Sequence, residues 1–295
     1  MLSKVSSSLL QRSSSQCMRP LSIAKPMFDA EASKIYTQLA EQHRHPDGPW
    51  PLMLSEVIAV ASQHSGPMQI LDVASGMGEP ALTIAKTLPN ATILSTDFSQ
   101  DMVDMAVLAS KDFPNLTCSK MDAEDMSQLA DNSQDVVVCC YGYMFPQDKV
   151  KALQESRRVL KEGGTLVATT WDNVDILHCL KDVMTAVLGK PPPPPQFNPM
   201  SLSEPGLFNS LLLEGGFSAS KIKTVTSKYP FDLGTDKTMQ FKMGTMLAKD
   251  KIGELGKWEV AETAFWANIG KYSVVEESGA RVIPNNVFKM FVVKK

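Results

Sequence analysis

The chain has 295 residues, of which 43% are hydrophobic, and its formal charge is -3 at pH 7. This length and this hydrophobic fraction predict one large globular domain or two small ones, and they exclude a fibrous or wholly disordered protein. The sequence contains no basic patch, which argues against an enzyme that tracks the phosphates of a nucleic acid.

The first 26 residues differ in composition from the rest of the chain. They contain eight serines, four basic residues and no acidic residue, and residues 2–10 give a helix one apolar side. This composition is typical of an organelle transit peptide, so we predict import into the mitochondrial matrix, with a plastid or cytoplasmic location as the alternative. No apolar run approaches the roughly 20 residues of a membrane helix, and we expect no membrane-spanning segment.

Short apolar runs alternate with helical patterns from about residue 66 onward, which is typical of a parallel α/β sheet. Strands are predicted at 68–73, 91–96, 116–120, 135–140 and 165–171, and helices near 80–88, 99–111 and 147–160. Pro80 is suited to open the first of these helices and Ser99 to cap the second. Gly163 and Gly164 are predicted to end the third.

Beyond residue 171 the pattern becomes less regular. We predict helices at 173–188 and 204–214, a strand near 219–229, a terminal strand at 287–295, and about 50 mainly helical residues between those two strands. Pro191–Pro195 must be extended, and we interpret them as a stiff linker rather than a ligand for a proline-binding partner. The five cysteines show no disulfide framework and no metal-ligand spacing, so no metal site is predicted.

The loop after the first predicted strand contains Gly76-x-Gly78-x-x-Ala81, which formally satisfies the dinucleotide-binding pattern. The charges around it favour another ligand. Asp72 and Glu79 flank the loop and would make a phosphate costly there. S-adenosylmethionine (SAM) has no phosphate and carries an ammonium and a sulfonium, which nearby acids favour.

Acidic residues also follow the next two predicted strands. Asp97 closes the second strand, where a carboxylate can accept both hydroxyls of a ribose, and Asp122 follows the third, near the place expected for an adenine amino group. Together with Asp72, these acids outline one cofactor that lies across the carboxyl edge of the sheet.

The motifs "LDVASGMGEPAL", "STDFSQDM", "KMDAEDM" and "DVVVCCYGYMFPQDKVKALQESRRVLKEGGTLVATTW" resemble, in order and spacing, those of class I SAM-dependent methyltransferases. The similarity covers residues 70–172, and the branch is that of the ubiquinone/menaquinone-biosynthesis methyltransferases. Ala74 departs from the family, which usually has glycine there, and alanine is tolerable at this position if its φ is negative.

The resemblance implies a Rossmann-like α/β fold with a seven-stranded sheet: five parallel strands, then a pair in which the terminal strand lies antiparallel beside the sixth. Helices would cover both faces. The implied organisation is a helical lid at 27–65, a SAM-binding core at 66–172, and a C-terminal part at 173–295 with a helical cap at about 233–283. The residues expected to bind SAM are Asp72, Ala74, Ser75, Gly76, Gly78, Pro80, Asp97, Phe98, Met102, Asp122, Ala123 and Cys140.

The acceptor side is predicted from residues that follow the fourth and fifth strands and from the lid. Tyr141 and Tyr143 should face the transferred methyl group. His43, Arg44 and His45 form a polar cluster in the predicted lid, where a histidine, chosen here as His45, could act as a base. Arg44 could hold an acceptor carboxylate. Further residues predicted to contact the acceptor are Tyr36, Trp50 and Trp171. Core packing, or a solvated loop in the lid, is the alternative for each.

The sequence therefore predicts a methyltransferase that acts on a small molecule and not on nucleic acid. A large apolar pocket would suit a quinone precursor, and a small basic one a carboxylated thioether or a hydroxy acid such as a methylthio-hydroxybutyrate. A SAM-binding organelle assembly factor without catalytic activity is the rival hypothesis. A macromolecular methyltransferase is a third, although the Asn/Asp-Pro-Pro-aromatic tetrapeptide of many amino-group methylases is absent. A homodimer is compatible with the sequence.

Overall fold

The computed structural model describes residues 30–195 and 198–295, and the predicted transit peptide at 1–26 lies outside them. The helices are α1 (Ala30–Glu41), α2 (Pro49–Ala61), α3 (Ala81–Thr87), α4 (Gln100–Ala109), α5 (Lys149–Val159), α6 (Asp175–Leu188), α7 (Leu207–Glu214), α8 (Lys237–Thr245), α9 (Lys249–Glu254) and α10 (Trp258–Asn268). A short 3-10 turn, η1 (Gln42–Arg44), joins α1 to the segment before α2.

The strands are β1 (Gln69–Val73), β2 (Thr92–Asp97), β3 (Leu116–Lys120), β4 (Gln134–Cys140), β5 (Leu160–Val174), β6 (Ile222–Asp232), β7 (Val274–Val275) and β8 (Arg281–Lys294). They form one sheet in the order β3-β2-β1-β4-β5-β8-β6. Strands β1 to β5 pair in parallel, and β8 is antiparallel to both β5 and β6. This order confirms the predicted α/β fold, and the two-residue β7, paired with β8, is an addition that the sequence pattern did not indicate.

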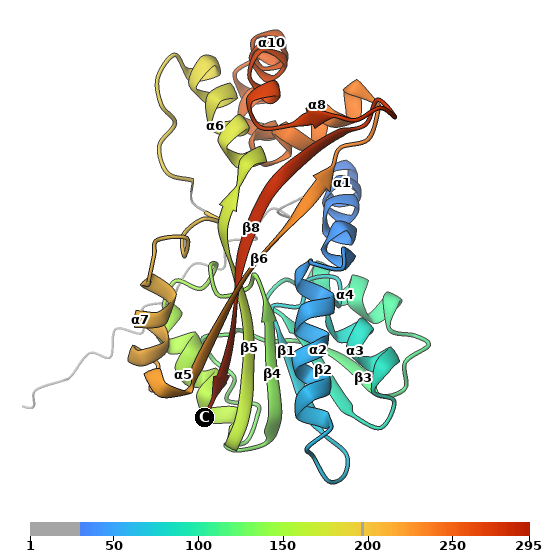
Figure 1. The fold of residues 1–295 in the computed structure, drawn as a ribbon, viewed down its shortest axis with the longest axis vertical. Coiled ribbons are helices and arrows are strands. Elements are labelled where there is room, and N and C mark those ends of the chain that lie inside the picture. The colour runs from blue at the N-terminus through green and yellow to red at the C-terminus, as the bar shows by residue number, and fades with distance from the viewer. Residues whose placement is uncertain (1–29, 196–197) are drawn as a thin grey trace, which may run out of the picture.

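Helices lie on both faces of the lower part of the sheet. Figure 1 shows α2, α3 and α4 to one side of the strands and α5 and α7 to the other. Strands β1 and β4, at the centre, are almost entirely buried, as expected for parallel strands covered on both faces.

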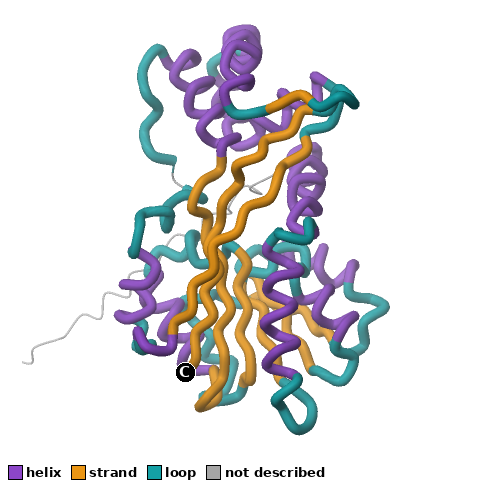
Figure 2. Tube along the Cα trace, in the orientation of Figure 1, coloured by secondary structure: helices purple, strands orange, loops and turns teal. Residues whose placement is uncertain are grey.

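The long strands β5, β6 and β8 continue above this core into a second layer of helices. Figure 2 shows the three strands crossing between the lower and upper parts, and Figure 1 places α6, α8 and α10 at the upper end. The carboxyl ends of the parallel strands point toward this upper part. The helical residues within 233–283 therefore stand beyond the edge at which open α/β sheets bind ligands.

Two predicted boundaries are corrected. The predicted strands at 165–171 and 287–295 are the central or terminal parts of longer strands. Strand β5 begins at Leu160, which pairs with β4, and β8 begins at Arg281, where it pairs with β7 and then β6 before it reaches β5. Gly163 and Gly164 do not end a helix. Helix α5 stops at Val159, and the glycines lie inside β5, next to the point where its register with β4 shifts.

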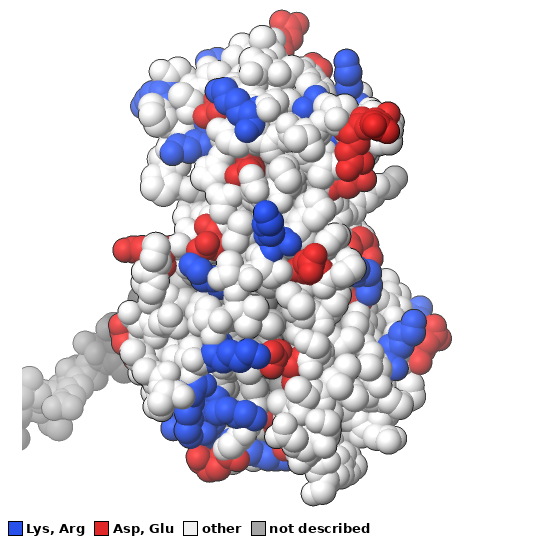
Figure 3. Space-filling model, in the orientation of Figure 1, with Lys and Arg blue, Asp and Glu red and all other residues white. Residues whose placement is uncertain are grey.

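The described residues contain no helix long and apolar enough to cross a membrane and no cluster of potential metal ligands. Their four cysteines are all free. On the face drawn in Figure 3, lysine and arginine side chains are interspersed with acidic ones over most of the surface.

Candidate active site

The loop that follows β1 is tied to the end of β2 by hydrogen bonds. Ser75 donates its backbone N–H to Thr96 O (2.8 Å), and Gly76 donates its own to Asp97 Oδ2 (2.9 Å). Gly78 N–H in turn donates to Ser75 O (3.0 Å), which closes the turn. These bonds hold the loop over the carboxyl ends of β1 and β2, where the sequence predicted the cofactor.

Three residues of this loop have left-handed backbone conformations. The φ angles are +57° at Gly76 and +106° at Gly78, which glycine adopts readily. Ala74 has φ +56°, so the condition under which alanine is unstrained at this position is not met. An alanine in this region costs about 1–3 kcal/mol, so the surrounding structure must hold it in place. The side chain that Gly76 lacks would meet no atom of residues 30–195 or 198–295 within 4 Å, so the backbone there faces open space between the described residues.

Asp97 connects the loop to the start of α4. Its Oδ1 accepts from Ser99 N–H (2.8 Å) and its Oδ2 from Gly76 N–H (2.9 Å). Burial raises the pKa of Asp97, and these backbone N–H groups oppose the rise. Each carboxylate oxygen can accept a further hydrogen bond, so the side chain can still receive two hydroxyl donors.

Asp72 lies beneath the same loop and is fully buried. Its Oδ2 accepts from Ala81 N–H at the start of α3 (3.0 Å), but among the described residues Oδ1 has no hydrogen-bond partner. Burial raises the pKa of this carboxyl well above its usual range. A cationic ligand close enough to interact with Asp72 would offset that cost.

The remaining cofactor-side residues follow β2, β3 and β4. Met121 donates its N–H to Asp97 O (3.0 Å), which brings the end of β3 beside the end of β2. Asp122, exposed, follows directly, and its Oδ1 accepts from Glu124 N–H (2.9 Å). Phe98 is 67% exposed, and Met102 lies in the first turn of α4. Ala123 follows Asp122, and Cys140, at the end of β4, accepts from Thr169 Oγ1 (3.7 Å).

Glu79 is not a free carboxylate. It forms an ion pair with Arg44, and its other oxygen accepts from Thr83 N–H (3.1 Å). Arg44 also pairs with Glu41 (2.6 Å) and lies over the Trp50 ring at 4.8 Å. The argument that Glu79 adds an uncompensated negative charge to the loop is therefore corrected, because the lid residue Arg44 balances it.

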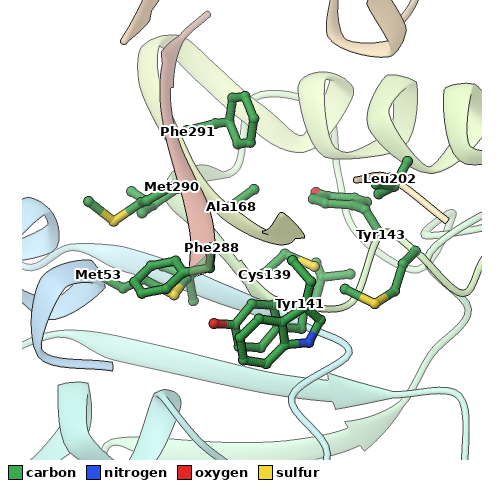
Figure 4. Close-up of a cluster of buried hydrophobic side chains, with 14 of the residues drawn as sticks. Met53, Cys139, Tyr141, Tyr143, Ala168, Leu202, Phe288, Met290 and Phe291 are labelled. Carbon is green, nitrogen blue, oxygen red and sulfur yellow. The ribbon is translucent and has the colours of Figure 1, made fainter. Parts of the chain in front are cut away.

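Tyr141 and Tyr143 point in different directions. Tyr141, with φ +57°, directs its ring toward Met53 and Phe288, whereas Tyr143 lies near Leu202 (Figure 4). The Tyr143 hydroxyl is paired with Ser156 Oγ (2.6 Å), and only 1% of the residue is exposed. The expectation that both tyrosines face the methyl group is corrected: Tyr143 is a core residue, because consecutive bends after β4 turn it away from Tyr141.

Five rings gather beside Tyr141 and form with it what we call the aromatic cluster. Its members come from η1, α2, the end of β4, β5 and β6: they are His43, Trp50, Tyr141, Trp171, Tyr229 and Phe231. Tyr141 stacks on Trp171 with centroids 3.9 Å apart. Two of the predicted acceptor residues, Trp50 and Trp171, are thus brought together with Tyr141.

His43, rather than His45, occupies the centre of this cluster. Its Nδ1 lies 2.7 Å from the hydroxyl of Tyr229, and that hydroxyl is 3.5 Å from the hydroxyl of Tyr141. Burial lowers the pKa of His43 to about 3. His45 is partly exposed, and its Nδ1 accepts from Asp47 N–H (3.1 Å). The side chain of Tyr36 is outside the described part of the structure.

Sequence reasoning placed His43 in the polar cluster of the lid but selected His45 as the base, and it did not select Tyr229. His43 is two residues from His45, and nothing in the spacing says which ring the short η1 turn directs inward. Tyr229 follows a polar, alternating stretch of β6. The feature that could have pointed to it is that it is an aromatic residue near the carboxyl end of the sixth predicted strand.

The sequence and the fold of this chain were compared with those of known proteins. Residues 70–164 match a family described as a methyltransferase domain. An uncharacterised protein of Mycobacterium tuberculosis is 33% identical over 132 residues, which cover 42% of this chain and 47% of that protein. A ubiquinone/menaquinone biosynthesis C-methyltransferase, UbiE, of Bdellovibrio bacteriovorus is 34% identical over 109 residues, 37% of this chain and 46% of its own.

Among solved structures, the YcgJ protein of Bacillus subtilis superimposes with a TM-score of 0.53 at 17% identity, covering 82% of this chain and 98% of that one. This superposition shows that the two proteins share a fold. Residues 70–164 form a class I SAM-dependent methyltransferase domain. The chain spans about half the length of the curated relatives that it matches.

The methyltransferase domain uses SAM as its cofactor, and the residues present fit that group. Asp97 offers acceptor capacity for two hydroxyls, Gly76 leaves open space beside the loop, and Asp72 presents a buried oxygen without a partner in the described part of the chain. Asp122 supplies an exposed carboxylate at the end of β3. These groups lie along one edge of the sheet and suit a ligand that carries a ribose and positive charge.

Proposed function

We propose that this protein transfers a methyl group from SAM to a small-molecule acceptor. The observation that carries the proposal is Asp97, which binds the backbone of the Gly76 loop and retains acceptor capacity at the carboxyl end of β2. This arrangement prepares a ribose site before any ligand arrives, because the carboxylate is already oriented by Gly76 and Ser99.

The protein's main task in such a reaction is alignment. SAM supplies a methyl group on a sulfonium whose sulfur leaves readily, so the acceptor atom must only be held in line with it. Tyr141 directly follows Cys140, the last residue of β4 and one of the predicted cofactor-side residues. Trp171, on which Tyr141 stacks, lies in β5. We therefore assign acceptor binding to the aromatic cluster and cofactor binding to the loop and the three acids.

Between the two acceptor classes considered from the sequence, the contacts favour the flat apolar one. Holding a carboxylated acceptor would need a free cation, and Arg44 is already paired with Glu41 and Glu79. Aromatic rings, in contrast, provide large apolar faces for a planar ring. A quinone precursor is consistent with this chemistry, and the relative UbiE is named as a quinone-biosynthesis C-methyltransferase.

The experiment is a calorimetric titration with SAM and with its demethylated product, followed by transfer of a labelled methyl group to small molecules from an organelle extract. We expect micromolar binding of both ligands and label in a small molecule. Binding without any labelled product would support the rival, non-catalytic assembly factor, and absence of binding would exclude both.

Asp97→Asn tests the assignment of the ribose site. The substitution keeps the shape but removes the charge, and hydrogen bonds to charged groups contribute about 1.5–3 kcal/mol each. We expect SAM affinity to fall roughly 10- to 100-fold. Asp112→Asn, at an exposed carboxylate beyond α4, is the matched control and should leave the dissociation constant unchanged. Equal affinities for wild type and Asp97→Asn would refute the ribose role.

A further inference from the structure

His43 lies at the centre of the aromatic cluster, and the proposed function gives its two ring nitrogens no chemical role. The ring is enclosed by aromatic residues from four other parts of the chain, with centroids 5.5 Å from Trp50, 5.4 Å from Tyr141, 5.9 Å from Trp171 and 5.8 Å from Tyr229. Its only polar contact among the described residues is between Nδ1 and the Tyr229 hydroxyl, at 2.7 Å. The second ring nitrogen, Nε2, has no hydrogen-bond partner among those residues.

The Tyr229 hydroxyl fixes the orientation of this imidazole. Tyr229 is 1% exposed, and burial raises the pKa of its hydroxyl well above the usual range, so the hydroxyl stays protonated and uncharged. When Nδ1–H donates to the Tyr229 oxygen, Nε2 carries the lone pair and can accept a proton. The Tyr229 proton is then free to point toward the Tyr141 hydroxyl, 3.5 Å away.

Resting on the proposed function, we propose that His43 Nε2 is the general base of the methyl transfer and that the acceptor is a phenol or enol. In the step, the acceptor oxygen or activated ring carbon bonds to the methyl carbon, the carbon–sulfur bond breaks, and its electron pair goes to sulfur. The acceptor proton moves to Nε2. Tyr229 acts as a positioning residue, because it holds the ring without touching the acceptor.

The charge balance of the site suits a neutral imidazole. Burial keeps His43 unprotonated at neutral pH, which avoids a second cation beside the sulfonium. In the proposed step the sulfonium charge disappears as the imidazolium forms, so the net charge of the site does not change.

The test compares two acceptors of similar size that differ in whether a proton must leave. Phenol is protonated near neutral pH, and 4-nitrophenol is largely ionised in mildly alkaline solution. Single-turnover transfer from SAM with a labelled methyl group is measured for wild type, His43→Gln, Tyr229→Phe and the control His178→Gln. His178 is a suitable control because it lies on α6, with Nε2 bonded to Asn173 Oδ1 at 2.9 Å.

For His43→Gln we expect the transfer rate to phenol to fall about 100-fold or more, with KM little changed, since general bases typically contribute that much. The rate with 4-nitrophenolate should change less than about threefold, because no proton has to be removed. The deficit with phenol should shrink as pH rises and phenol ionises. Tyr229→Phe should show the same selective loss to a smaller degree, and His178→Gln should match wild type.

The pH profile must be interpreted with the other titratable groups around His43, which are Tyr141 after β4, Tyr229 on β6, and Arg44 and His45 on its own segment. Two measurements do not depend on activity: the SAM affinity from calorimetry and the circular dichroism spectrum. We expect both to be the same in His43→Gln as in wild type. If that variant does not fold, Tyr229→Phe carries the comparison.

Equal losses for phenol and 4-nitrophenolate, or no loss for either, would overturn the base assignment while the proposed function stands. Wild-type protein that binds SAM and methylates another small molecule but neither phenol would overturn the acceptor class. Protein that binds no SAM would instead contradict the proposed function.

Discussion

At the scale of single residues, the most informative side chain is Asp72. It is a buried carboxyl with one oxygen bonded to the start of α3 and the other without a partner among the described residues. Its raised pKa means that the native state holds a proton that the unfolded chain releases at a lower pH. Ionisation of Asp72 therefore costs the ligand-free protein stability.

We expect Asp72→Asn to become progressively more stable relative to wild type as pH rises above roughly 4, the ordinary pKa of aspartate. From there toward the raised native pKa, the wild type should lose up to about 1.4 kcal/mol per pH unit from this group, and the amide variant nothing. Urea unfolding of both proteins without SAM, at several pH values, measures the difference. A constant difference across that range would contradict the raised pKa.

Ala74 illustrates how a residue-scale preference can be overridden. The sequence allowed either sign of φ, and the negative one is less strained for alanine. The observed φ of +56° follows from the loop's bonds to Thr96 and Asp97, which require the backbone to turn immediately after β1. Tertiary hydrogen bonds thus outweigh the local preference of the residue.

At the scale of elements, the turn after β4 meets the loop after β1 at Gly142. A methyl group at Gly142 would lie 2.5 Å from Cys139 Sγ and 2.7 Å from Ala74 Cβ. Both neighbours are packed in the core or against it. The close approach of these two segments keeps the ends of β1 and β4 together. It therefore also holds Tyr141, which follows β4, close to the cofactor loop that follows β1.

Gly142→Ala should therefore lower the free energy of unfolding by about 1–3 kcal/mol, which is typical of overpacking at a close contact. Gly270→Ala is the matched control, because a methyl group there would meet no atom within 4 Å. Its unfolding free energy should equal or exceed that of wild type, since alanine favours helical structure over glycine. Urea denaturation checks both, and equal stability of the two variants would show that the turn can move.

At the scale of the whole molecule, β5, β6 and β8 join the lower core to the upper helices (Figure 2). Strand β8 pairs with β6 from Val282 to Val293 and with β5 from Asn286 to Lys294, so one strand runs through both parts. The upper helices also pack on each other, with α10 against α6. A continuous ladder of this kind favours a single cooperative unit.

Hydrogen exchange should then show the same free energy of opening for amides in the upper part of β8, at 281–286, and in its lower part, at 287–294. Native-state exchange measured by mass spectrometry at increasing urea concentrations gives both values. Much faster exchange in the upper part alone would mean that the helices at the upper end open independently of the core.

Much of this architecture could be predicted from the sequence, because apolar periodicity reports burial directly. The strands β1, β2, β3 and β4 were located to within a residue or two. The signal is strongest at β1 and β4, where runs such as "DVVVCC" are buried on both faces. The lengths of β5 and β8 were underestimated. The missed residues of β5 lie mainly at 160–164, before its buried run, and the missed start of β8 at 281–283 pairs with β6 and β7. Local patterns carry no information about such partners.

The sequence by itself determined the succession of strands along the chain, the glycine loop, and the acids at the ends of three successive strands, because each of these depends on residue type and spacing along the chain. Only the tertiary structure decided that Glu79 is paired with Arg44, that Tyr143 faces the core, and that His43 meets Tyr229. The last contact joins residues 186 positions apart. Chain spacing does not encode the direction of a side chain after a turn, and that direction selects the groups around the acceptor.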